Sequence, residues 1–187
     1  MDYLETKISG ETKYHGVIVD VTLDEVELHT GEHTKREVVH HPGGVAVLPV
    51  DENGMAYLVR QFRYPFGKMV LECPAGKLEP GEEPRAAALR ELSEETGLEC
   101  GELVELGAIY ATPGYCTETL HIYLALDLTQ KEAHLDPGEY LNVERYPLDV
   151  LTKQCMAGEI RDGKTNVAVL KAARIMEERN GKKSADR

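Results

Sequence analysis

The first third of the chain alternates polar and apolar residues in short runs, a pattern typical of half-buried β-strands. Residues 16–28 predict one or two strands, and residues 35–40 predict a strand that returns beside them. Residues 45–50 are almost entirely apolar, which predicts a strand buried on both faces. Residues 51–54 then form a turn signal that leads into a partner strand over residues 55–61.

A helix is predicted over Pro84–Thr96 by signals at both of its ends. The proline suits a first turn because the N–H that it lacks would have no intrahelical partner there, and Gly97 suits a left-handed cap. Leu89, Leu92 and the alanines at 86–88 are expected to form the buried face of this helix.

The elements that follow complete an α/β pattern. The predicted strands span residues 69–73, 103–110, 120–126 and 140–146, and the predicted helices span residues 147–156 and 165–179. This order predicts a mixed sheet with helices on both faces. We expect residues 1–41 to form an antiparallel β-strand region, residues 42–180 to form the main domain, and residues 181–187 to be a loose tail.

Composition limits the classes of partner. A chain of 187 residues can bury one good core, and a net charge of −12 opposes binding to nucleic acid and to anionic membranes. No apolar run approaches the ~20 residues of a membrane-spanning helix. The four cysteines show no CxxC spacing and no apolar leader precedes them, so we expect free thiols in the cytoplasm.

Three glutamates, Glu91, Glu94 and Glu95, have the spacing that puts side chains on one face of a helix. Like charges at this spacing repel, and no Lys or Arg follows four residues later to compensate them. The face is therefore either solvated or bound to a cation. Glu82 and the bare backbone at Gly76 favour a cation, and an all-oxygen donor set suits Mg²⁺ or Mn²⁺ rather than Zn²⁺.

Residues 76–98 resemble the box that defines the Nudix hydrolases. The family pattern is a glycine, five residues, a glutamate, seven residues, Arg-Glu, an aliphatic residue, any residue, Glu-Glu, any residue, a glycine and an aliphatic residue. Every position matches, and the matching residues are Gly76, Glu82, Arg90, Glu91, Leu92, Glu94, Glu95, Gly97 and Leu98. A chance match is on the order of 10⁻⁹ per start position. The resemblance implies the Nudix fold, an α/β/α sandwich with a mixed sheet. Arg90 is expected either to fix a neighbouring carboxylate or to lie free at the surface.

Outside the box, the chain is similar to ADP-ribose pyrophosphatases. The similar stretches are residues 35–39, His41-Pro42-Gly43, residues 59–64, residues 72–76 and Thr112-Pro113-Gly114. The resemblance implies Mg²⁺-dependent hydrolysis of ADP-ribose to AMP and ribose 5-phosphate, with Mn²⁺ as a substitute metal. Two alternatives stay open: a Nudix enzyme for another nucleoside diphosphate sugar, and a non-catalytic Nudix domain that senses a nucleotide.

The resemblance also assigns metal ligands and catalytic residues. It implies that the carbonyl of Ala75 and the carboxylates of Glu91 and Glu95 hold metal, with Glu82 sharing a second ion. Glu94 is implied to be a ligand or a catalytic base. Together these residues would bind the metal ions that bridge the diphosphate.

For the substrate, the resemblance places Arg36 and Glu37 near the adenosine, Arg63 at the diphosphate and Pro113 in a loop of the site. A guanidinium is well shaped for phosphate oxygens, although both arginines would also be ordinary as exposed strand charges. Relatives of this type are homodimers whose N-terminal strands cross to the partner. We therefore expect a homodimer that binds a small nucleotide-sugar, with Arg36 and Glu37 completing a site shared between chains.

The catalytic base has several candidates because one loop departs from the family pattern. Relatives carry an acidic loop before the last sheet strand, whereas Pro137 stands here where the first glutamate is often found. Glu139 remains in this loop, and Glu118 and Glu94 are further candidates. Each would serve if its carboxylate reached the attacking water at ~3 Å, directly or through one more water.

Overall fold

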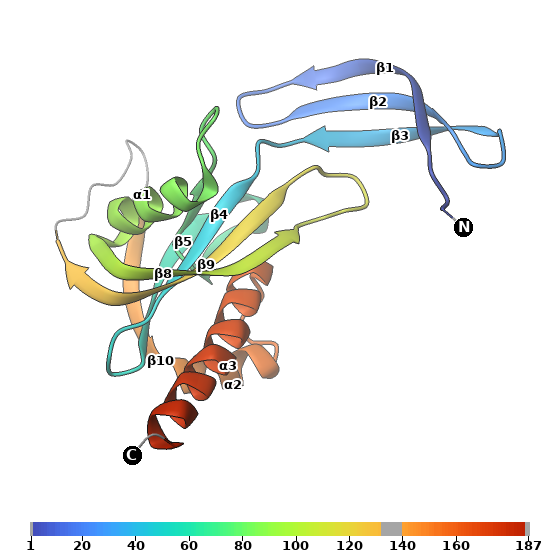
Figure 1. The fold of residues 1–187 in the computed structure, drawn as a ribbon. Coiled ribbons are helices and arrows are strands. Elements are labelled where there is room, and N and C mark those ends of the chain that lie inside the picture. The colour runs from blue at the N-terminus through green and yellow to red at the C-terminus, as the bar shows by residue number, and fades with distance from the viewer. Residues whose placement is uncertain (1, 132–139, 186–187) are drawn as a thin grey trace. The chain divides into compact units, whose positions relative to one another are not determined.

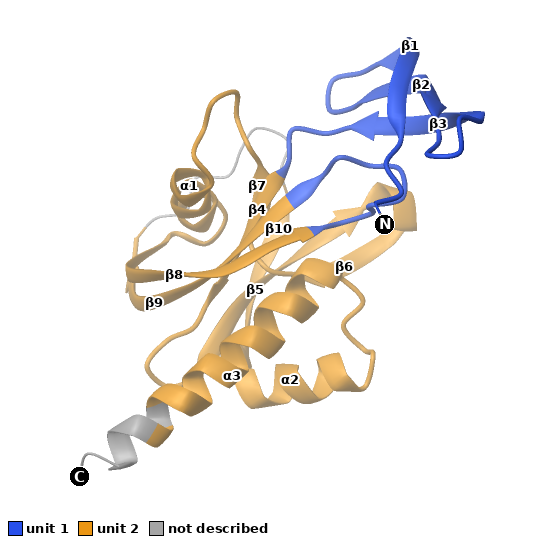
Figure 2. Cartoon of the chain, turned by 45° about the vertical axis from the view of Figure 1, so that its right-hand side comes forward, with its two compact units in different colours: residues 1–43, 110–119 blue, residues 44–109, 120–187 orange. Residues whose placement is uncertain are grey.

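The computed structural model describes residues 2–131 and 140–185, which form two compact units (Figure 2). The first unit comprises residues 1–43 and 110–119, and the second comprises residues 44–109 and 120–187. Each unit has sheets of its own. The dimerisation role expected for residues 1–41 stays a prediction.

The first unit contains a three-stranded antiparallel sheet with β2 in the middle. Its strands are β1 (Thr6–His15), β2 (Asp20–Glu27) and β3 (His33–His40). The sequence pattern did not predict β1. All ten of its residues are exposed, so no position has to be apolar and no alternating pattern arises.

The second unit contains two sheets, one of four strands and one of three. The four-stranded sheet has the order β7 (Ala75–Lys77), β4 (Gly44–Pro49), β9 (Thr119–Gln130), β8 (Leu98–Tyr110). The three-stranded sheet has the order β10 (Leu141–Pro147), β5 (Met55–Arg63), β6 (Lys68–Glu72), with the 3₁₀ turn η1 (Tyr64–Phe66) between the last two in sequence. The four-stranded sheet is mixed, because β4 runs parallel to β9 and antiparallel to β7.

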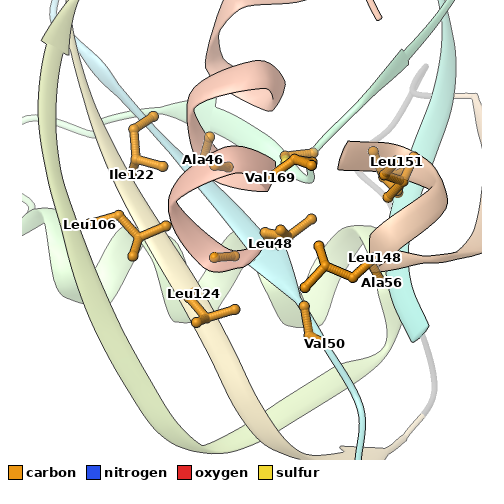
Figure 3. Packing of buried hydrophobic residues seen from close by; sticks show 14 of the residues in the cluster. Ala46, Leu48, Val50, Ala56, Leu106, Ile122, Leu124, Leu148, Leu151 and Val169 are labelled. Atoms are coloured by element: carbon orange, nitrogen blue, oxygen red, sulfur yellow. The ribbon is translucent and has the colours of Figure 1, made fainter. Parts of the chain in front are cut away.

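Helices cover both faces of this mixed sheet, as the ribbon shows (Figure 1). They are α1 (Pro84–Thr96), α2 (Leu148–Met156) and α3 (Gly163–Ala185). Along β4, alternate side chains serve opposite faces: Val45 and Val47 pack with Leu92 of α1. Leu48 instead packs with Val169 of α3 (Figure 3). The predicted α/β/α sandwich is thereby confirmed.

Helix α1 has the predicted bounds but not the whole of the predicted buried face. Gly97 caps it at φ 66°, and its N–H donates to the Ser93 carbonyl at 2.9 Å. Leu92 is fully buried, whereas Leu89 is 40% exposed, contrary to the prediction. Leu89 follows the buried Ala88 by one residue, which turns it about 100° around the helix and away from the sheet.

Helix α3 is longer at both ends than its apolar pattern predicts. Asp162 caps its start, since its carboxylate accepts a hydrogen bond from the backbone N–H of Thr165 at 3.0 Å. At its other end the helix continues to Ala185, so residues 181–185 are helical where the sequence predicts a loose tail. In the described part of the chain, no helix combines the length and apolarity needed to cross a membrane.

Candidate active site

The box residues gather where strand β7 meets helix α1. Pairing of β7 with β4 sets Gly76 opposite Val45, and the helix turns Glu91 toward the same glycine. A Cβ on Gly76 would lie 1.8 Å from Glu91 Oε1, so the carboxylate lies directly against the glycine backbone. The close approach of Glu91, and not the backbone conformation, is what requires glycine here, because the φ of Gly76 lies outside the left-handed region.

Glu95 is the buried carboxylate of the box, with 2% of its surface exposed. Its Oε2 accepts a hydrogen bond from the Ala75 N–H at 3.1 Å, which ties the end of α1 to the start of β7. Burying a carboxylate costs free energy unless it is paired or hydrogen-bonded, so such groups concentrate at functional sites. Glu95 and Ala75, both predicted metal ligands, are thus brought together.

Arg90 holds the other three carboxylates of the box. Its Nε and Nη2 donate to Glu82 at 3.0 Å each, and its Nη1 donates to Glu91 at 2.7 Å and to Glu94 at 3.0 Å. The expected pairing with one carboxylate is therefore a pairing with three. The expectation that no cation compensates the glutamates was wrong, because Arg90 compensates them from the N-terminal side of the helix.

These contacts favour the ionised form of Glu82. Hydrogen bonds from Arg90 hold the pKa of Glu82 below its ordinary value, and the same bonds raise the pKa of Arg90. Carboxylates and a backbone carbonyl make an oxygen-only donor set of the kind that Mg²⁺ and Mn²⁺ prefer. Within residues 2–131 and 140–185, no three His, Cys, Asp or Glu side chains are arranged to coordinate one ion. The metal assignment therefore rests on donor chemistry and stays a prediction.

Arg63 lies in a second charged cluster of the same unit. Its Nε and Nη2 donate to the two oxygens of Glu72 at 2.7 and 2.9 Å. Lys164 also donates to Glu72, and its ammonium lies 2.9 Å from Asp162. Burial raises the pKa of Glu72, but Arg63 and Lys164 together lower it by more than burial raises it. The pKa of Glu72 therefore lies below its ordinary value. Sequence reasoning missed Lys164 and Asp162, because they lie far along the chain from Arg63 and Glu72 and no spacing signal links the two pairs.

Beside this cluster, Cys73 is fully buried and its thiol is unreactive. Its backbone N–H donates to the Thr165 hydroxyl at 2.7 Å, and burial raises the pKa of its thiol to about 12. A thiol that stays protonated is a poor nucleophile and a poor metal ligand. Cys73 therefore adds no nucleophile to the carboxylate chemistry next to it.

The first unit carries a hollow of about 350 Å³ that brings together three of the predicted substrate residues, Arg36, Glu37 and Pro113. Its lining comprises Glu5, Arg36, Glu37, Val38, Pro113, Gly114, Tyr115, Cys116 and Thr117. Glu5 holds Arg36 through two hydrogen bonds of 2.6 and 2.9 Å. Sequence reasoning missed Glu5, which stands in a polar segment without any motif.

The three candidate bases have different surroundings. Glu139 lies outside the described residues. Glu118 belongs to the first unit, where its Oε1 lies 3.7 Å from His41 Nδ1. Glu94 belongs to the box cluster and is bound by Arg90. The choice among them stays open.

Comparison with known proteins agrees with this architecture. The NUDIX domain profile matches residues 40–166. The chain is 41% identical to the ADP-ribose pyrophosphatase of Bacillus subtilis (strain 168), over 90% of this chain and 93% of that protein. It is also 41% identical to the methanol dehydrogenase activator of Bacillus methanolicus, over 88% of this chain and 90% of that protein. A crystal structure of an ADP compounds hydrolase shares the fold, with a TM-score of 0.82 and 23% identity over 94% of this chain and 95% of that chain. The chain therefore belongs to the NUDIX family, whose hydrolases generally depend on a divalent metal.

Proposed function

We propose that the protein hydrolyses the diphosphate bond of ADP-ribose, giving AMP and ribose 5-phosphate, with Mg²⁺ as its metal. One observation carries the proposal: Arg90 binds three of the box carboxylates and one of them, Glu91, lies against Gly76, in a chain 41% identical to an ADP-ribose pyrophosphatase. Phosphoryl chemistry suits such a site, because Mg²⁺ is usually held by a few carboxylates together with substrate phosphates.

In this proposal the residues of the box hold the metal and Arg63 holds the substrate. Ala75 would contribute its carbonyl, and Glu82, Glu91 and Glu95 would contribute their carboxylates. Bound there, a divalent metal would polarise the phosphorus and lower the pKa of a water. Arg63 offers the diphosphate its Nη1, which the bonds to Glu72 do not use.

The reaction itself needs one water and one base. The water oxygen attacks phosphorus, the bridging P–O bond breaks, and the two halves leave as phosphomonoesters. A carboxylate takes the proton from the water, and Glu94, Glu118 and Glu139 are the candidates. Arg36, Glu37 and Pro113 would bind the adenosine in the hollow of the first unit.

A product assay tests the proposal directly. We expect equal amounts of AMP and ribose 5-phosphate from ADP-ribose with Mg²⁺, activity with Mn²⁺ as well, and no turnover in EDTA. The same assay should include GDP-mannose, UDP-glucose and diadenosine polyphosphates. Absence of AMP release from ADP-ribose would refute the proposed substrate. A preference for another sugar nucleotide would favour the first alternative, and no turnover of any would favour a sensing domain.

Arg36 provides a test of the nucleoside end. Arg36→Met should raise KM for ADP-ribose about tenfold, because it removes a cation from the hollow, while kcat changes less. Steady-state kinetics measure this split. Arg179→Met is the matched control: the Arg179–Glu102 pair is also held by two hydrogen bonds, and the two arginines are 38% and 41% exposed. Equal effects of the two substitutions would contradict a binding role for Arg36.

We further propose a cytoplasmic homodimer in which the N-terminal strands complete a site shared between chains. Support comes from β1, which is exposed along its whole length, and from Val17 and Ile18, which are 97% and 57% exposed. The four free cysteines suit the cytoplasm.

Mixing two impaired variants tests the shared site. Arg36→Met and Glu95→Gln chains that reassemble together would form one intact site in each mixed dimer. At substrate concentrations below KM, activity should then rise toward about a quarter of the wild-type value. Activity equal to the mean of the two variants would show that each chain supplies both residues to its own site.

A further inference from the structure

Lys164 is a largely buried cation that neither the box nor the proposed chemistry uses. It lies in the first turn of α3, where its side chain is only 12% exposed. Its ammonium donates to Glu72 Oε2 and to Asp162 Oδ1, the second at 2.9 Å. Burial lowers the pKa of Lys164, but Asp162 and Glu72 raise it more, so the group stays charged. A charge kept in such a place calls for a reason beyond packing.

Glu72 shares its two oxygens unequally between its two cations. Oε1 accepts from Arg63 Nε, and Oε2 accepts from both Arg63 Nη2 and Lys164 Nζ. The exposures also differ: Glu72 is 3% exposed and Lys164 is 12% exposed, whereas Arg63 is 37% exposed. Lys164 therefore holds the carboxylate from the buried side, and Arg63 holds it from the solvent side.

This arrangement fixes which edge of the guanidinium is available. A guanidinium that binds a carboxylate through Nε and Nη2 has Nη1 on its other edge. Glu72 can hold Arg63 in this way only while its own rotamer is fixed, and Lys164 fixes it by binding Oε2. Asp162 in turn holds Lys164 and caps α3 at the Thr165 N–H.

The net charge of this cluster also depends on Lys164. Arg63 and Lys164 carry two positive charges, and Glu72 and Asp162 carry two negative charges, so the cluster is balanced. Without Lys164 the remaining three groups would carry a net negative charge, and Arg63 alone would neutralise the buried Glu72. Both changes weaken the attraction between Arg63 and an anionic diphosphate.

We propose that Lys164 is a positioning residue for the substrate diphosphate: it neutralises and orients Glu72, which in turn presents the Nη1 edge of Arg63 to the phosphate oxygens. The inference rests on the proposed function, because it requires a diphosphate for Arg63 to bind. It goes beyond that function by assigning a positioning role in diphosphate binding to a residue outside the box.

A double-mutant cycle on KM tests this inference, with ADP-ribose as the probe and saturating Mg²⁺. Lys164→Met should raise KM about tenfold and change kcat less than about threefold, and Lys164→Arg should restore most of the affinity. Arg63→Met should raise KM at least as much. Because Lys164 acts through Arg63, adding Lys164→Met to Arg63→Met should change KM by less than about twofold. Lys153→Met is the control, since Lys153 forms an ion pair with Asp149 and is 76% exposed; it should leave KM unchanged.

Three other outcomes overturn the inference, and one refutes the proposed substrate alone. Multiplicative effects of the two substitutions would show that Lys164 acts independently of Arg63. If Lys164→Met does not fold, Lys164→Gln supplies the cycle, because it keeps a donor for Glu72 without the charge; failure of both to fold would make Lys164 a framework residue. A wild-type protein that releases no AMP refutes the proposed substrate alone, and the cycle is then measured with the substrate that the product assay identifies. A protein that hydrolyses none of those compounds overturns both proposals.

Discussion

Replacing Glu95 with glutamine is expected to lower kcat for ADP-ribose by at least about 10³-fold while the protein still folds. The amide has nearly the shape of the carboxylate, and its oxygen can still accept the Ala75 N–H bond that spans 3.1 Å in the wild type. What is lost is a negative charge at a buried position where the proposal puts a metal ligand. Each ~1.4 kcal/mol of lost transition-state stabilisation is a factor of ten in rate, and a missing ligand removes several kcal/mol.

Stability separates this loss from unfolding. Glu95 is 2% exposed, and a neutral amide avoids the desolvation of a buried charge. In EDTA, the midpoint of thermal unfolding should therefore be no lower for Glu95→Gln than for the wild type. Glu102→Gln is the control, because Glu102 is 43% exposed and pairs with Arg179, which is not a residue of the box. Near-normal turnover by Glu95→Gln would refute the proposed metal site.

The fold was largely predictable where burial imposes a regular spacing of apolar residues on the sequence. Strand β4 is apolar at nearly every position because each of its two faces is covered, by Leu92 of α1 on one side and by Val169 of α3 on the other. Helix α1 was predicted at both ends because Pro84 and Gly97 are conformational signals that need no tertiary context. Strand β1 was missed because an exposed strand leaves no hydrophobic period to detect.

The site was predictable to the extent that its geometry is local. Helical spacing alone places Glu94 within reach of both Arg90 and Glu91. The contact between the neighbouring residues Arg90 and Glu91 is not given by that spacing. The contact between Arg90 and Glu82 depends on the path of a loop, and helix spacing cannot give it. Glu72 and Lys164 meet only because β6 and the start of α3 come together in the folded unit, which is why sequence reasoning did not pair them.

These contacts divide the site into a framework and a reactive part. Arg90 and Lys164 each bind at least two carboxylates, so each keeps like charges close together at a known position. Electrostatic catalysis requires that charged groups are held in place before the substrate arrives, because no free energy is then spent on reorganising them. The glycine beneath Glu91 belongs to the same framework, since it alone permits that carboxylate to lie against the strand.

Gly76→Ala should therefore remove activity and leave stability nearly unchanged. The new Cβ would lie 1.8 Å from Glu91 Oε1 and 2.1 Å from its Cδ, so Glu91 must leave its position. The displaced atoms are the end of a flexible side chain, and Gly76 does not have positive φ, so the backbone is not strained. We expect kcat to fall at least about 100-fold, and the free energy of unfolding to change by less than about 1 kcal/mol.

Gly44→Ala makes the complementary comparison, because its Cβ would meet backbone rather than side chain. That Cβ would lie 2.7 Å from the carbonyl oxygen of Gly76 on the paired strand β7, and a backbone group in a ladder has little room to move. Gly44→Ala should therefore lower the unfolding free energy by more than Gly76→Ala does. Gly181→Ala, with nothing within 4 Å of its Cβ, should leave activity unchanged, and because Gly181 lies in α3 it should raise the unfolding free energy by up to about 1 kcal/mol. Activity assays and urea denaturation of the three variants measure both quantities; a Gly76→Ala protein with wild-type kcat would show that Glu91 need not lie against the strand for turnover.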